Sequence, residues 1–428
     1  MDSVRPRLVF LTRSFPRRGP DDSFLRCEVA VLSRYFDIHF VPTEPLASQD
    51  MPRLAETQQV DTTLANSVKR KPLDTVRGMF VGDVRREIQS QRSTSLRALA
   101  VVARRWTRVD AGSHWAREHL VPQLKEHSTV VYSWWSVPEA LGVARELRSS
   151  RVPMVTRMHG YDLYPEQDRL TFIPFQRELI DSVDKVYSVS RAGERYLRSR
   201  YPELTDKLRC SYLGVDRAPA MSQSSNDGIF RVVSCSSLVP VKRVDLLVDA
   251  LLILRARGVK FEWTHIGDGP DKQDLVAQAS PLGDQAHFLG ELPHDQVRAW
   301  LARNPVDIFC NVSESEGLPV TLMEAASCGI PLFATDVGGN NEIVDESVGR
   351  LIPGSAGPDV VADMLTDMAS QSESTKHGWR RRSAQRWVSS FDAEHNYENF
   401  AEELLNVLRE KCDVDQNSAR LDNWKESF

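Results

Sequence analysis

The most constraining feature of this sequence is a repeated alternation of short apolar runs with segments of helical length. Six runs occur in the first half, starting at Leu8, Asp37, Thr129, Val152, Lys185 and Leu208. Six more follow, starting at Phe230, Phe261, Ala286, Val306, Pro331 and Val348. Because β-rich runs that alternate with helices form parallel sheets covered on both faces, the sequence predicts an α/β protein with two doubly wound domains.

The two series are separated by a polar stretch with little helical pattern, residues 217–228. A chain of 428 residues is long enough for two cores of ordinary size. We therefore predict an N-terminal domain over residues 1–217 and a C-terminal domain over 228–390. Apolar residues at helical spacing from Phe400 to Leu408 predict a long helix over 391–412, followed by a polar tail over 413–428.

Composition excludes several classes of protein. The 54 Lys and Arg residues against 59 Asp and Glu residues give a net charge of -5, which does not favour nucleic-acid binding. The six cysteines are widely spaced, without a metal-ligand pattern, and no apolar stretch approaches 18 residues. We expect a cytoplasmic protein without a metal site.

A strongly basic segment lies in the predicted first domain. Residues 69–108 contain eleven Lys or Arg against three acids, a local charge of +8. One interpretation is a helical surface that makes peripheral contact with anionic lipid head groups at the inner face of the plasma membrane, or with a phosphate-bearing acceptor. The other is a helical insertion whose charges are simply solvated.

The stretch most suggestive of chemistry is NVSESEGLPVTLMEAASCG, from Asn311 to Gly329. An apolar strand ends there in acids and a glycine, and Pro319 favours the start of a helix. The backbone amides of Gly317, Leu318 and Val320 would then point outward at the positive end of the helix dipole. The pattern predicts an anion-binding helix terminus.

Two carboxylates and a cation accompany this terminus. Glu316 and Glu324 stand eight residues apart, where both are able to accept hydrogen bonds from hydroxyls, or else serve as a helix cap and a solvated surface group. Lys242 follows the first strand of the same domain, with Arg243 beside it. A ligand that carries both phosphate and sugar hydroxyls fits this set of groups.

These residues resemble a known family, the retaining glycosyltransferases of family 4. Their GT-B architecture has two facing Rossmann-like domains, and it implies that the C-terminal helix crosses back to the first domain. SESEGLPVTLMEAASCGIPLFATDVGGNNEIV is similar to the E-x7-E block of that family and its flanks. Further similar segments follow in the family's order: RMHGYDLY, SVSRAGERYL, YLGVD, VSCSSLVPVKRVDLLVDAL, HIGDGP and HFLGELPHDQV. The opening SFP with DDSFLRCEVAVL resembles the branch that assembles polysaccharides and glycolipids.

The resemblance implies a retaining, metal-independent transfer of a hexose-type sugar from a nucleotide diphosphate sugar to a glycan or glycolipid acceptor. The donor is a substrate, and no other cofactor is implied. Lys242 would contact the donor diphosphate and Glu324 the ribose hydroxyls. Glu316, with the amides around Pro319, would address the transferred sugar, and His159 would lie beneath the anomeric carbon.

The sequence departs from the family at Ser237, which stands where an arginine is common. Arg243 either replaces that donor to the diphosphate or faces solvent at the start of a helix. The first βα loop, TRSFPRRGPDDSF, also lacks the glycine-rich pattern often found there, so contacts from that side stay unassigned.

His159 has a structural alternative, because a histidine after an apolar strand is often a hydrogen-bonded interior group. Asp162 fits either an acceptor contact or a turn cap. Trp134 and Trp135 offer an aromatic face to a sugar, but tryptophans are more often part of core or interdomain packing.

Two alternative functions remain. A GT-B sugar-nucleotide epimerase shares the architecture and would convert the donor without an acceptor. A degenerate GT-B scaffold would keep the fold and assist a partner transferase.

Overall fold

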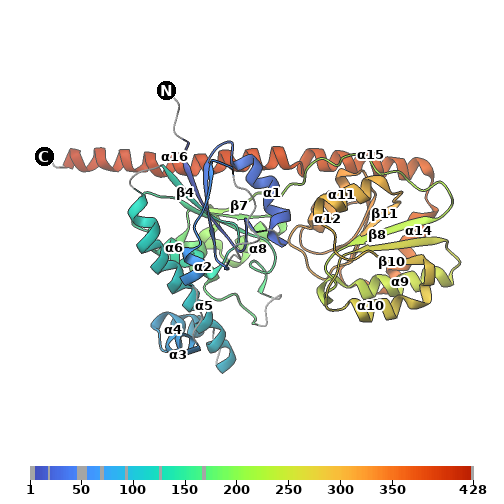
Figure 1. Cartoon of the computed structure of the whole chain (residues 1–428), viewed down its shortest axis with the longest axis horizontal. Coiled ribbons are helices and arrows are strands. Elements are labelled where there is room, and N and C mark those ends of the chain that lie inside the picture. The colour runs from blue at the N-terminus through green and yellow to red at the C-terminus, as the bar shows by residue number, and fades with distance from the viewer. Residues whose placement is uncertain are drawn as a thin grey trace. The chain divides into compact units, whose positions relative to one another are not determined.

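The computed structural model describes residues 5–17, 20–45, 55–67, 72–91, 95–124, 128–165 and 170–425, with the backbone alone at 20–24, 72–74, 294 and 412–425. The chain forms two compact units (Figure 1). Unit 1 comprises Met1–Val189, Gly193–Ser211 and Tyr397–Phe428, and unit 2 comprises Ser190–Ala192 and Tyr212–Asn396. The predicted α/β fold class is confirmed.

Unit 1 is built on a parallel sheet, which has seven strands in the described part of the chain, in the order β3-β2-β1-β4-β5-β6-β7. The strands are β1 (Arg7–Thr12), β2 (Asp37–Pro42), β3 (Gln58–Val60), β4 (Thr129–Ser133), β5 (Met154–Met158), β6 (Lys185–Ser188) and β7 (Leu208–Cys210). Six of these coincide with predicted runs. The sequence analysis missed β3, since its three residues, two of them glutamine, show no apolar pattern.

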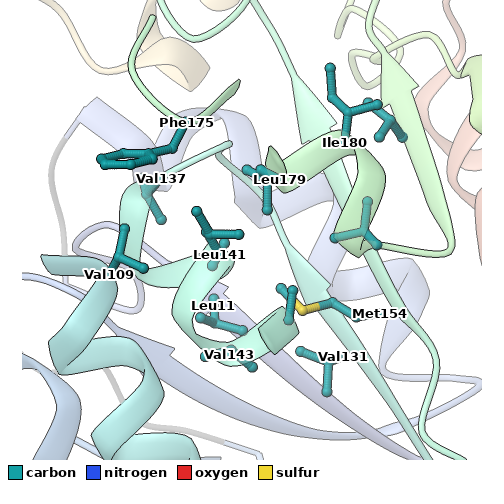
Figure 2. Close-up of a cluster of buried hydrophobic side chains, with 14 of the residues drawn as sticks. Leu11, Val109, Val131, Val137, Leu141, Val143, Met154, Phe175, Leu179 and Ile180 are labelled. Atoms are coloured by element: carbon teal, nitrogen blue, oxygen red, sulfur yellow. The ribbon is translucent and has the colours of Figure 1, made fainter. Parts of the chain in front are cut away.

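Unit 1 also contains helices, some of which pack against this sheet. They are α1 (Pro20–Leu32), α2 (Thr63–Ser67), α3 (Pro72–Gly78), α4 (Gly82–Ser90), α5 (Leu96–Trp115), α6 (Pro138–Leu147), α7 (Gln176–Ser182) and α8 (Arg191–Arg200). Figure 2 shows part of the core, where Leu141 and Val143 of α6 lie with Val131 of β4 and Met154 of β5. This apolar layer covers one face of the central strands.

The C-terminal helix α16 (Ala393–Lys425) belongs to unit 1 from Tyr397 onward. Its Phe400 ring lies 4.1 Å from the guanidinium carbon of Arg157 on β5. The helical backbone continues to Lys425, so the segment 413–428 that we predicted as a separate polar tail extends α16 for most of its length. Phe400 therefore fixes the helix against the sheet of unit 1.

Unit 2 also has a parallel sheet, of six strands among the described residues, in the order β10-β9-β8-β11-β12-β13. The strands are β8 (Phe230–Cys235), β9 (Phe261–Ile266), β10 (Ala286–Phe288), β11 (Ile308–Asn311), β12 (Leu332–Asp336) and β13 (Gly349–Pro353). The helices are α9 (Val244–Ala256), α10 (Lys272–Ala279), α11 (His294–Arg303), α12 (Val320–Ser327), α13 (Asn340–Ile343), α14 (Pro358–Ser370) and α15 (Glu373–Ser390). All six strands were predicted.

The predicted linker packs on unit 2. The backbone amide of Ser222 donates to the carbonyl of Cys328 (2.9 Å), and Ser225 donates through its amide and its hydroxyl to the carboxylate of Asp307. The division between the units falls at Ser211 and Tyr212, before the stretch 217–228. The polar composition of residues 217–228 predicted a linker between the domains. The hydrogen bonds of this segment instead make it part of unit 2.

Candidate functional site

The sheet of unit 2 reverses its strand order between β8 and β11. Ligands of doubly wound sheets bind beyond the carboxyl ends of the strands at such a switch point. The loop after β8 contains a short 3-10 turn, Pro240–Lys242, and the loop after β11 contains Glu316. Lys242 and Glu316 therefore lie together where the fold favours a ligand site, and their contacts with a donor stay predictions.

The Glu316 side chain is buried, and three donors converge on one of its oxygens. Oε1 accepts hydrogen bonds from Lys242 Nζ (2.7 Å), from Ser313 Oγ (2.7 Å) and from Asn311 Nδ2 (3.1 Å). None of the described residues donates to Oε2. Glu316 is thus held in a fixed orientation by one oxygen, and the other is available to a ligand hydroxyl.

Lys242 keeps donor capacity of its own. Its ammonium group has three N–H donors, and the structure places Glu316 on one of them. The side chain is about one quarter exposed. A phosphate oxygen can thus bind to Lys242 without displacing Glu316, and the carboxylate offsets part of the charge while the site is empty of anion.

Backbone contacts fix the loop that carries Glu316. The amide of Glu314 donates to the carbonyl of Val241 (2.8 Å), which joins the loop to the 3-10 turn of Lys242. The hydroxyl of Thr335 donates to the carbonyl of Ser313 (2.6 Å), which joins it to β12. The loops after three neighbouring strands are therefore connected before any ligand binds.

Gly338 lies against the backbone of Glu316, in a position where no side chain fits. Its φ of 53° is in the left-handed region, and a Cβ added there would lie 1.8 Å from the carbonyl oxygen of Glu316. The next residue, Gly339, donates its amide to the carbonyl of Gly317 (3.0 Å). The glycine pair thus allows the 335–340 loop to pack directly against the backbone around Glu316.

Helix α12 begins at Val320, with Pro319 as its cap, one residue later than the sequence predicted. The amides of Gly317, Leu318 and Val320 donate to none of the described residues, and Leu318 itself is buried. These amides stand at the positive end of the helix dipole, next to Glu316. The predicted anion-binding terminus fits this geometry.

The structure does not favour Arg243 as a phosphate donor. Its Nη1 donates to the carbonyl of Gly354 (2.6 Å) and its Nη2 to that of Ala356 (3.0 Å), so the guanidinium fork is occupied by backbone. The residue adopts a φ of 49° as it enters α9. Ser237, at the position of the missing arginine, is exposed. Arg243 therefore holds the β13–α14 loop in place instead of replacing that arginine.

Glu324 lies on α12 and is only 1% exposed. Its Oε1 is 3.9 Å from Nη1 of Arg298 on α11, and Nη2 of Arg298 is 3.3 Å from Asp216. The sequence analysis missed Arg298, since nothing in the α11 pattern links it to an acid 26 residues later. The structure brings Glu324 to this arginine, and its predicted contact with ribose stays a prediction.

In unit 1, His159 follows β5 and is buried between two indoles. Its ring centroid is 4.2 Å from that of Trp134 and 4.1 Å from that of Trp135. The exposed Tyr161 ring lies 4.8 Å from Trp135. Neither ring nitrogen of His159 nor Nε1 of Trp135 has a hydrogen-bond partner among the described residues. Burial lowers the pKa of His159, more than the nearby carboxylate of Asp162 raises it, so the ring is neutral near pH 7.

Asp162 acts as a turn cap, one of the two roles left open by the sequence. Oδ1 accepts the backbone amide of His159 (2.7 Å) and Oδ2 that of Ser136 (2.9 Å). The carboxylate joins the loop after β5 to the loop after β4. It thereby fixes the aromatic cluster of Trp134, Trp135, His159 and Tyr161.

A family of known proteins matches the second half of the chain. Residues 220–386 match the family model described as glycosyl transferases group 1. This range contains the two unit 2 loops that carry Lys242 and Glu316. Residues 220–386 therefore form a domain of the glycosyl transferases group 1 family.

Two curated relatives are similar over about half of this chain. A putative colanic acid biosynthesis glycosyltransferase, WcaL of Salmonella typhimurium, is 28% identical over 220 residues, 49% of this chain and 53% of its own. The GDP-mannose-dependent alpha-(1-6)-phosphatidylinositol monomannoside mannosyltransferase of Mycolicibacterium smegmatis is 32% identical over 53% of this chain and 63% of its own. The chain thus spans about half the length of these relatives.

A solved structure extends the likeness to the whole fold. The lipopolysaccharide outer core galactosyltransferase WaaB aligns with a TM-score of 0.67 at 15% identity, over 94% of this chain and 99% of its own. The fold is accordingly GT-B, with two Rossmann-like units. Among the described residues, no helix is long and apolar enough to cross a membrane, and no group of three or more His, Cys, Asp or Glu is arranged to hold a metal ion.

Proposed function

We propose that this chain is a retaining glycosyltransferase that moves a hexose-type sugar from a nucleotide diphosphate sugar to a glycan or glycolipid acceptor. The observation that carries the proposal is the convergence of Lys242, Asn311 and Ser313 on Oε1 of Glu316 at the switch point of unit 2. Such a cluster offers a cation for phosphate beside a carboxylate for hydroxyls. The similarity to a GDP-mannose-dependent mannosyltransferase supports a donor of this class.

In the proposed reaction, the bond between the anomeric carbon and the diphosphate oxygen breaks, and the acceptor oxygen bonds to that carbon on the same face. The nucleoside diphosphate leaves with the electron pair of the broken bond, and its departing oxygen takes up the proton that the acceptor hydroxyl loses. Lys242 and the amides at the start of α12 stabilise the charge that develops on the leaving group. We propose that no metal ion takes part in this step.

The other groups have positioning roles in this proposal. Glu316 binds hydroxyls of the transferred sugar through Oε2, and Glu324 binds the ribose. Unit 1 carries the acceptor, with His159 contributing to the acceptor side of the reacting carbon. Its neutral ring is able to donate from one nitrogen and accept at the other. We place the reaction in the cytoplasm.

A transfer assay tests this proposal. The purified chain is incubated in EDTA with ¹³C-labelled UDP-glucose, UDP-galactose or GDP-mannose and a panel of short glycan and glycolipid acceptors, and products are followed by NMR. We expect one donor to give a glycoside with the anomeric configuration of the donor, and Glu316→Gln to abolish most of it. Inversion at the anomeric carbon would contradict the retaining mechanism. Conversion of the donor to an epimer in the absence of acceptor would contradict transfer and support the epimerase alternative.

A further inference from the structure

The helices α3, α4 and the first part of α5 form a projection that the proposed reaction does not use. We call residues 72–91 and 95–108 the basic insert. Figure 1 shows these helices lying away from the strands of unit 1. Within the insert, Gly78 lies against Ala103 and Trp106 of α5, and Met79 packs against the core of unit 1.

Two acids of the basic insert, Asp83 and Glu87, have described side chains, and both are engaged by the protein itself. Asp83 pairs with Arg86 on its own helix and with Arg145 on α6 (2.9 Å). Glu87 accepts the backbone amide of Phe175 (3.0 Å), and burial raises its pKa. The arginines behave differently: Arg77, Arg85, Arg97 and Arg104 are all exposed. The charge that the insert presents outward is therefore strongly positive.

Large apolar side chains project from the same insert. Leu96 is 82% exposed, Phe80 70% and Val76 50%. Phe80 stands at the turn between α3 and α4, and Leu96 opens α5, directly beside Arg97. Exposed apolar side chains at helix ends and turns cost solvation free energy unless a partner covers them.

This combination of exposed arginine with exposed phenylalanine and leucine fits one class of partner best. A nucleic acid would pair with the arginines, and an unpaired base would stack on Phe80, but it offers no apolar phase to Leu96. An anionic bilayer satisfies both, because its head groups attract the guanidinium groups and its acyl boundary takes up the apolar tips. We infer that the basic insert docks the chain on an anionic lipid surface, with Phe80 and Leu96 entering the interface. The inference deepens the proposed function by placing the chain beside a lipid-borne acceptor.

Vesicle sedimentation with the full chain tests this inference, and it needs no donor or acceptor. The probes are vesicles of phosphatidylcholine alone and vesicles that contain one third phosphatidylglycerol. We expect binding to the anionic vesicles only. Loss of each apolar tip, in Phe80→Ser or Leu96→Ser, should weaken binding about 10-fold or more. Arg77→Glu with Arg97→Glu should weaken it about 20-fold or more, and added salt should have the same effect.

Control variants separate these effects from general surface changes. Val388→Ser removes an apolar side chain that is 54% exposed in unit 2, and Arg303→Glu reverses an exposed arginine of α11. Both should bind vesicles like the wild type, and circular dichroism should show every variant folded. The inference would be overturned if Phe80→Ser and Leu96→Ser bound anionic vesicles as tightly as the wild type. Tight binding of the wild type to a mixed-sequence DNA duplex, without vesicle binding, would also overturn it. Because vesicle binding requires no catalysis, its failure is distinguishable from failure of the transfer assay.

Discussion

The two units share the same order in their first six strands but organise the groups at the strand ends in different ways. In unit 2 a carboxylate, Glu316, receives three side-chain donors where the strand order reverses. In unit 1 an imidazole, His159, lies between two indoles with neither nitrogen bonded. In the first arrangement one carboxylate oxygen is fully engaged by side chains of the protein. In the second, neither imidazole nitrogen is hydrogen-bonded by a described residue, although Oδ2 of Asp162 lies 3.7 Å from Nδ1.

In unit 1, a buried ion pair is linked to the aromatic cluster through Trp134. Nη1 of Arg157 lies 2.8 Å from Oε2 of Glu28, and both side chains are fully buried. Glu28 also accepts from Tyr132 Oη (3.0 Å) and from Trp134 Nε1 (2.8 Å). Both oxygens of the unit 1 carboxylate are thus bonded within the protein, whereas Glu316 in unit 2 accepts hydrogen bonds from the described residues through Oε1 alone.

The largest effect that we predict tests this supporting role. Glu28→Gln removes the charge that compensates Arg157, which should lower the free energy of unfolding by about 3–5 kcal/mol. Urea unfolding of the whole chain measures the loss. The control is Arg177→Met, which breaks an exposed pair with Glu203 in the same unit and should cost less than about 1 kcal/mol. Equal costs for the two variants would show that the buried pair has no special role.

The second prediction concerns the unit 2 cluster. Glu316→Gln keeps the size of the side chain but removes its charge, and should lower kcat/KM for transfer about 100- to 1000-fold. The matched control is Glu314→Gln, because Glu314 is an exposed acid in the same loop. The pair of variants is compared in initial-rate assays at several donor concentrations. Unchanged transfer by Glu316→Gln would remove this carboxylate from the mechanism.

The third prediction concerns the buried histidine His265 in unit 2. His265 on β9 has both nitrogens bonded: Nδ1 lies 2.9 Å from Ser234 Oγ, and Nε2 lies 3.2 Å from the carbonyl of Ser236. Because the carbonyl only accepts, Nε2 carries the proton and Nδ1 accepts from the Ser234 hydroxyl. Burial lowers the pKa of His265 to about 4, whereas an imidazole in the unfolded chain titrates near 6.5.

The sign of the pH effect follows from this difference. Below pH ~6.5 the imidazole of residue 265 is protonated in the unfolded chain but stays neutral in the folded protein. The free energy of unfolding therefore decreases by about 3 kcal/mol as the pH falls from neutral toward 4. Urea unfolding at pH 7 and pH 4 should therefore show a smaller loss for His265→Gln than for the wild type. His287→Gln, which removes an exposed imidazole from β10, serves as the control. Equal losses in wild type and His265→Gln would contradict the assignment.

The smallest predicted effect sharpens the role of the aromatic cluster. Tyr161→Ala removes the exposed ring beside Trp135 and should raise the KM for a saccharide acceptor about 3- to 10-fold, with donor binding unchanged. Acceptor titrations at saturating donor measure this. Phe80→Ala, assayed with a soluble acceptor, is the control for loss of an exposed ring elsewhere in unit 1. A change in donor affinity, with the acceptor KM unchanged, would contradict an acceptor-binding role for Tyr161.

Hydrophobic periodicity predicted twelve of the thirteen strands among the described residues, because buried parallel strands read as apolar runs. Local pattern also placed Lys242 and Glu316 at neighbouring strand ends. Pattern did not reveal what Arg243 contacts, since its partners are backbone carbonyls more than 100 residues away. The pairing of Glu28 with Arg157 was equally invisible: an arginine within the apolar run VPMVTRM requires a buried acid, but 129 residues separate the two.

The central claim is that Lys242 and Glu316 form the binding site for a nucleotide diphosphate sugar without a metal ion. Isothermal titration of UDP-glucose, UDP-galactose and GDP-mannose in EDTA tests it directly, with wild type, Lys242→Met and the exposed control Lys260→Met. We predict that wild type and Lys260→Met bind one of these donors equally and that Lys242→Met binds it about 10- to 100-fold more weakly. Equal binding by Lys242→Met, or binding by the wild type only after a divalent cation replaces EDTA, would contradict the account.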